Sequence, residues 1–138
     1  MKSNNRGVTL IELVVVILIV GILAAFAVPS YRQYLLRTHR AEAKSALLNL
    51  AAAQEKFYLQ NNIYATDAAL TDAAPDGLGL SATTENGYYS IEITAADANG
   101  FSATATAEGG QADDGRCASF TIDQAGSKTA TSADCWER

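Results

Sequence analysis

Few residues of this chain of 138 amino acids have types and spacing that support chemistry. The only histidine is His39, and the two cysteines, Cys117 and Cys135, lie far from it in the sequence. We expect no Ser-His-Asp triad to form around a single histidine carried on a helix, and a zinc site needs more ligands than this set provides. The chain also contains no phosphate-binding glycine loop and no His-Glu-x-x-His sequence. We therefore expect no enzyme activity, no catalytic residue, no metal and no cofactor.

The two cysteines favour a disulfide. Seventeen residues, positions 118 to 134, lie between Cys117 and Cys135. Closing a loop of this length stabilises a fold by about 3 kcal/mol in the chain-entropy treatment, and it requires an oxidising compartment. The alternative is two unrelated buried thiols. An export signal at the N-terminus favours the disulfide.

One acid, Glu12, stands near the start of a long apolar segment. From Leu13 to Tyr31 no residue is charged. As a helix this stretch extends about 28 Å, close to the hydrocarbon thickness of a bilayer. Lys2 and Arg6 precede it, as the positive-inside rule requires of a cytoplasmic end. The segment is therefore expected to cross a membrane with its N-terminus inside.

Three interpretations of this segment are open. A buried core helix would need more apolar residues elsewhere in the chain to surround it. A cleaved secretory signal is supported by Ala25-Phe26-Ala27, but Glu12 is unusual in such a signal and the helical pattern continues beyond the cut. The third interpretation, which we favour, is a membrane anchor processed at Gly7, where the polar leader ends.

Charge divides the chain. Residues 1–44 hold six basic and two acidic residues, a net charge of +4, whereas residues 45–138 hold four basic and thirteen acidic residues, a net charge of −9. Nucleic-acid binding depends on neutralising phosphates, so we do not expect nucleic acid as a partner. We expect His39, which stands among cations of the first part, to be a surface residue.

The elements that carry these residues are a long helix and a small sheet. Leu36, Ala43, Leu50, Phe57 and Tyr64 recur every seven residues, which predicts an amphipathic helix that ends near Asn61 and Asn62. Alternating apolar residues then predict antiparallel strands packed on that helix, an α+β fold. The strands are expected at positions 88–96, 101–107, 118–123 and 127–131.

The N-terminal string "RGVTLIELVVVILIVGILAAFAVPSYRQY" resembles the class III signal of type IV prepilins. The resemblance implies that a prepilin peptidase cuts after Gly7 and methylates the amine of Val8, although the family more often has an aromatic residue at that position. Gly21 and Pro29 stand where such helices carry a kink. Glu12 would pair with the new amine of a neighbouring subunit and so set the register of assembly. An ion pair within one chain, or a role in peptidase recognition alone, are the alternatives for Glu12.

The C-terminal string "CASFTIDQAGSKTATSADCWER" resembles the disulfide-bounded region of PilE-type minor pilins. The expected fold is thus the type IV pilin fold. Its expected parts are a leader (1–7), an assembly helix (8–31), an amphipathic helix (32–64), a loop region (65–87) and a sheet with the disulfide region (88–138).

The resemblance implies a structural subunit of a type IV pilus, most similar to a minor pilin that acts in assembly, twitching motility, adhesion or DNA uptake. Its partners would be other pilin subunits, the peptidase and an assembly platform in the bacterial inner membrane. A DNA-binding minor pilin, a major pilin and a type II secretion pseudopilin are the alternatives. The basic run would either contact acidic surfaces of neighbouring subunits or form a solvated helix face; it comprises Arg32, Arg37, Arg40 and Lys44.

Overall fold

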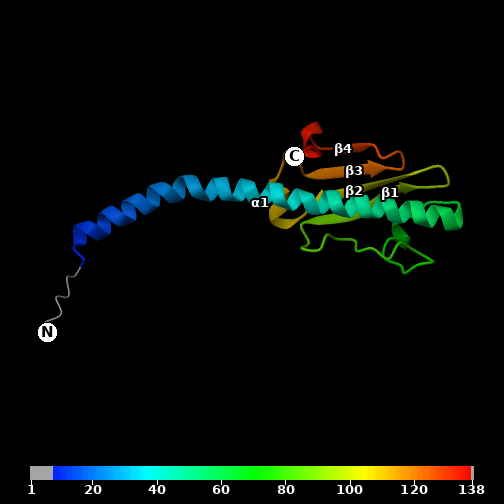
Figure 1. Cartoon of the computed structure of the whole chain (residues 1–138), viewed down its shortest axis with the longest axis horizontal. Coiled ribbons are helices and arrows are strands. Elements are labelled where there is room, and N and C mark those ends of the chain that lie inside the picture. The colour runs from blue at the N-terminus through cyan, green and yellow to red at the C-terminus, as the bar shows by residue number, and fades with distance from the viewer. Residues whose placement is uncertain (1–7, 138) are drawn as a thin grey trace. The chain divides into compact units, whose positions relative to one another are not determined.

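A computed structural model describes residues 8–137 as one long helix followed by a four-stranded sheet (Figure 1). The helices are α1 (Leu10–Asn61) and three short 3-10 segments, η1 (Asp67–Ala69), η2 (Gly109–Asp113) and η3 (Ala133–Cys135). The strands are β1 (Tyr89–Ala96), β2 (Phe101–Ala107), β3 (Ser119–Asp123) and β4 (Lys128–Ala130). Contacts divide the chain into two units, and the boundary falls between Leu35 and Leu36.

Helix α1 ends close to where the sequence predicts. Its last residue is Asn61, and Asn62 takes the left-handed conformation with φ of 55°. The backbone amide of Asn62 donates to the carbonyl of Tyr58, which closes the last turn. Asparagine tolerates this conformation better than most residues and commonly stops a helix. Tyr64 therefore lies beyond the helix, although it is buried as the stripe predicts.

The part of α1 in the second unit buries one stripe of side chains. The spacing alternates between four and three residues, which keeps the stripe on one helical face. Phe57, expected within the stripe, is only half-buried. Two members of the stripe, Arg40 and Gln54, are polar. The full buried set is Leu36, Arg40, Ala43, Leu47, Leu50 and Gln54.

All four predicted strands are present, and they form an antiparallel sheet in the order β1-β2-β3-β4. The predicted alternation is confirmed, because Tyr89, Ile91 and Ile93 are buried along β1 while Glu92 between them is exposed. Strand β2 follows the same rule and buries its alternate residues; they are Phe101, Ala103, Ala105 and Ala107. One face of the sheet therefore belongs to the core.

The core of the second unit lies between this face and the helical stripe. Leu47 and Leu50 of α1 belong to the same buried cluster as Tyr89, Phe120 and Cys135. Figure 1 shows the C-terminal part of α1 lying along the strands. The expected α+β architecture, one long helix on a small antiparallel sheet, is confirmed.

Candidate assembly surface and its supports

The first part of α1 exposes an apolar surface along its length. A window of 18 residues in this helix has a mean hydropathy of 3.0, and none of it is buried. The exposed fraction is 81% for Leu10 and 74% for Phe26. By length and composition this helix can cross a membrane. An apolar surface of this extent marks contact with lipid or with other protein chains.

Glu12 lies in the first turn of this helix and is exposed. Its backbone amide donates to the side-chain oxygen of Thr9 at 3.3 Å. Thr9 thus caps the helix, and the two residues have the spacing of a capping box, in which an acid three residues after the cap supports the helix start. The string Thr-x-x-Glu at positions 9–12 is the sequence signal for this local role, which the predictions above do not include.

The other predicted processing and kink residues are only partly described. Gly7 lies outside the described residues, whereas Val8 is described and exposed. Gly21 and Pro29 both lie within α1, and a side-chain carbon at Gly21 would meet no atom within 4 Å. Cleavage, methylation, the kink and the ion pair of Glu12 stay predictions.

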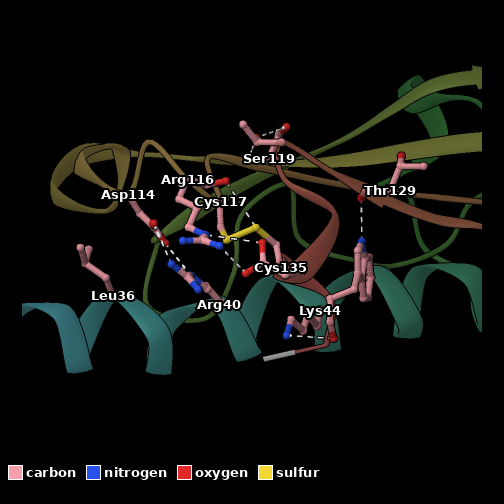
Figure 2. The surroundings of a disulfide bond; sticks show 12 residues. Leu36, Arg40, Lys44, Asp114, Arg116, Cys117, Ser119, Thr129 and Cys135 are labelled. Carbon is pink, nitrogen blue, oxygen red and sulfur yellow. Dashed lines mark hydrogen bonds and ion pairs between the residues drawn. A yellow bond between two sulfur atoms is a disulfide. The ribbon is translucent and has the colours of Figure 1, made fainter.

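In the second unit, a buried ion pair joins α1 to the segment after β2. Arg40 donates from Nε to Oδ2 of Asp114 at 2.7 Å and from a terminal nitrogen to Oδ1 at 2.9 Å. Figure 2 shows Arg40 reaching from the helix to Asp114. The hydrogen bond to Asp114 raises the pKa of Arg40. Both expectations for the basic run, a neighbouring subunit or solvent, are therefore wrong for Arg40.

The same region contains a buried glutamine that fixes η2 against the helix. Gln111 donates from Nε2 to the carbonyl of Leu36 at 3.1 Å and to the hydroxyl of Tyr89 at 2.9 Å. Its Oε1 lies 2.9 Å from Nδ1 of His39, whose ring stacks on Tyr88. His39 is thus a packed residue, half-buried, and not merely a surface one. Burial raises the pKa of Tyr89 to about 12, because the phenolate would lose its hydration.

The expected disulfide joins Cys117 to Cys135 with a Cα–Cα distance of 5.7 Å (Figure 2). Both cysteines are buried. The next residue, Trp136, places its ring edge-on to Phe120 with 5.6 Å between ring centres, and its carbonyl accepts a hydrogen bond from Lys44 at 3.2 Å. The disulfide therefore holds the C-terminal turn against both the sheet and the helix. Trp136 therefore packs on the sheet.

Among residues 8–137, no group of three or more His, Cys, Asp or Glu side chains is placed to hold a metal ion. The exposed apolar helix can bind lipid or other protein chains. One unit presents an exposed apolar helix with a single acid, and the other is a cross-linked globular unit.

Comparison with known proteins identifies the family. The profile described as "Type IV minor pilin ComP, DNA uptake sequence receptor" matches residues 29–121. The profile of the prokaryotic N-terminal methylation motif matches residues 2–28. Together the two matches cover most of the chain, including the apolar helix, all of β1 and β2 and the first part of β3.

Relatives and solved structures agree with these profiles. Fimbrial protein EcpC of Eikenella corrodens is 35% identical over 101 residues, which cover 72% of this chain and 61% of that protein. The type IV major pilin PilA of Myxococcus xanthus is 42% identical over 75 residues, covering 54% of this chain and 34% of that protein. The matches span between about a third and three fifths of the length of these relatives.

Two solved structures share the fold. The minor pilin PilV of Neisseria meningitidis matches with a TM-score of 0.53 at 19% identity, covering 73% of this chain and 91% of that one. A type IV pilin of Shewanella oneidensis matches with a TM-score of 0.50 at 26% identity, covering 75% of this chain and 99% of that one. With an N-terminal methylation motif on an exposed apolar helix and a disulfide-linked α+β unit, this chain belongs to the type IV pilin family and carries a prepilin signal.

Proposed function

We propose that this pilin is a minor subunit of a type IV pilus that acts in assembly or initiation of the fibre. Through the fibre it would serve twitching motility, adhesion or DNA uptake. The observation that carries the proposal is the uncovered apolar helix with one acid, Glu12, in its first turn. Such a helix is stable in lipid or among other helices of the same kind, and a pilin moves from the first environment to the second. The matched family profile, which describes a minor pilin, supports the minor role.

The proposed route begins in the bacterial inner membrane. The N-terminus would face the cytoplasm and the disulfide-linked unit the periplasm, where disulfides form. A prepilin peptidase would cut after Gly7, remove the leader (1–7) and methylate the amine of Val8. An assembly platform would then transfer residues 8–31 from lipid to the helical core of the fibre, so that the final location is the extracellular pilus.

Glu12 would guide this transfer. Within the fibre its carboxylate would be surrounded by apolar side chains, and an unpaired buried carboxylate costs several kcal/mol. Cleavage would create a positively charged α-amine on Val8, and the amine of a neighbouring subunit could pair with Glu12. Pairing with that amine would place each subunit in one register, whereas the capping contact with Thr9 serves only the local helix.

The test is to shear fibres from cells and to determine the amount and the N-terminus of this chain in them. We expect N-methylated Val8 as the first residue and an amount well below that of another pilin. A first residue at Val28 would show an ordinary secretory cut and overturn the membrane-anchor route. An amount equal to the bulk of the fibre would make the chain a major pilin instead.

A second candidate function is a DNA receptor for natural transformation. The observation in its favour is the description of the matched profile as a receptor of DNA uptake sequences. The contacts of two cations in the globular unit argue against a DNA receptor. Arg116 pairs with Asp134 at 2.7 Å, and Lys128 lies over the ring of Trp136. Cations that already pair with a carboxylate or lie over a ring contribute less to phosphate binding than a cluster of unpaired cations.

A gel-shift experiment with the globular fragment separates the two functions. A receptor would retard DNA at low salt and lose affinity steeply as salt increases, since counterion release drives phosphate binding. A sequence-specific receptor would also prefer one DNA sequence over a scrambled one. Absence of retardation at low salt would leave the assembly role alone.

A further inference from the structure

An acidic groove lies between α1 and the segment 80–86 that precedes β1. Two adjoining hollows of about 170 and 200 Å³ share four lining residues; these are Ala46, Asn49, Thr84 and Glu85. Each hollow is smaller than the range of about 300–1,000 Å³ that is usual for small-molecule sites. The groove is therefore better sized for one or two side chains of a partner protein than for a metabolite.

The chemistry of the groove favours a cationic side chain with an apolar stem. Leu50 and Ile91 contribute apolar surface to one hollow, Glu42 lines the other, and Glu85 lines both. Glu42 accepts a hydrogen bond from Nδ2 of Asn86 at 2.6 Å, which holds the segment to the helix without neutralising the carboxylate. Within the described range 8–137, neither acid forms an ion pair. Arginine and lysine bury an aliphatic stem and keep a charged end at the rim.

The same chain exposes a side chain of that kind. Arg37 is exposed on α1, and in the described part of the chain it forms no ion pair, unlike Arg40 one turn later. Tyr31 and Tyr34 of the same helix are also exposed, by 64% and 65%. Tyrosine and arginine are enriched among the residues that contribute most to protein–protein binding.

A fibre needs such a pair of different surfaces on each subunit. Head-to-tail contacts that do not close into a ring generate a helical filament, and each copy then uses one surface for the copy before it and another for the copy after it. This chain has two such surfaces of opposite charge, the acidic groove and the exposed Arg37.

We propose that the groove receives Arg37 of a second copy of this chain, with Glu85 as its ion-pair partner and Glu42 as a further negative charge. The inference rests on the proposed function as a pilus subunit. For a minor subunit, it applies where two copies are neighbours in the initiating complex.

The experiment uses the full chain in cells, with two differently tagged copies that both carry Arg37→Lys. A carbodiimide joins a lysine amine to a carboxylate as an amide, and the carbodiimide takes up the water that is lost. We expect a cross-linked dimer that contains both tags, in which mass spectrometry finds position 37 of one copy joined to Glu85 of the other.

The matched control compares two acids. Adding Glu85→Gln should reduce the dimer roughly tenfold, whereas Glu108→Gln, at an exposed acid outside the groove, should leave it unchanged. A dimer that is insensitive to Glu85→Gln would overturn the proposal, and so would a cross-link only within one copy or only to a different pilin. Chain present in the fibres without the cross-link would refute the contact alone. Chain absent from the fibres would refute the proposed function and this contact with it.

Discussion

Replacement of Arg40 should strongly destabilise the globular unit. Its partner Asp114 is 5% exposed, so Arg40→Met leaves a buried carboxylate without a cation. We expect the free energy of unfolding to fall by about 3–5 kcal/mol. Urea denaturation of a fragment covering 32–138, which keeps one helical turn before Leu36, measures this loss.

Two further variants isolate the cause. Arg37→Met changes an exposed arginine and should alter stability by no more than about 0.5 kcal/mol. Arg40→Met combined with Asp114→Leu removes both charges and should cost much less than Arg40→Met alone, because no unpaired charge remains. A double variant as unstable as the single one would mean that packing, and not the ion pair, is responsible.

Tyr89 makes stability depend on pH in the alkaline range. Its pKa is about 12 in the folded protein against about 10 in an unfolded chain. Between these values the unfolded state loses the phenolic proton while the folded state keeps it, so stability falls as pH rises. From about pH 9 to about pH 11 the unsubstituted fragment should lose about 1 kcal/mol more than Tyr89→Phe. Equal losses in the two proteins would contradict the assignment.

At the scale of elements, the C-terminal turn depends on the disulfide. The bond closes a loop with a sequence separation of 18, so replacing both cysteines by alanine should lower the free energy of unfolding by about 3 kcal/mol. Hydrogen exchange should increase first around η3 and β4, because Cys135 anchors them beside Phe120. Reduction of the unsubstituted fragment should reproduce the loss. Unchanged stability after both treatments would show that packing of Trp136 suffices.

The sequence predicts the regular elements well because their signals are local. Period-two alternation marks β1 and β2, and the asparagine pair marks the end of α1. The polar members of the core carry no such signal, since Asp114 stands in a string rich in glycine and aspartate that is typical of a turn. Only the position of Arg40 on the buried stripe, four residues after Leu36, indicates its burial, and its partner comes from 74 residues away.

The residues with predicted roles in processing and assembly differ from those of the core. Roles for Gly7, Val8 and Glu12 are predicted from a residue string that resembles a known signal. The predicted roles involve a peptidase and neighbouring subunits. A single chain describes Glu12 only as an exposed acid beside Thr9. The resemblance therefore predicts a role for Glu12 that depends on a neighbouring subunit.

At the scale of the whole molecule, the account predicts that entry into the fibre depends on the charge of Glu12. Glu12→Gln is the informative variant, because glutamine also serves at this place in a capping box and only the charge is lost. Thr9→Ala is its counterpart, since it removes the cap and keeps the acid. Both chains should reach the membrane with the disulfide formed.

The deciding measurement is the amount of each chain in sheared fibres relative to the membrane fraction. We expect Glu12→Gln to lower this ratio at least about tenfold, as loss of a buried ion pair worth more than about 1.4 kcal/mol requires. Thr9→Ala should lower it far less. If Glu12→Gln enters fibres at the level of the unsubstituted chain, the acid does not direct assembly.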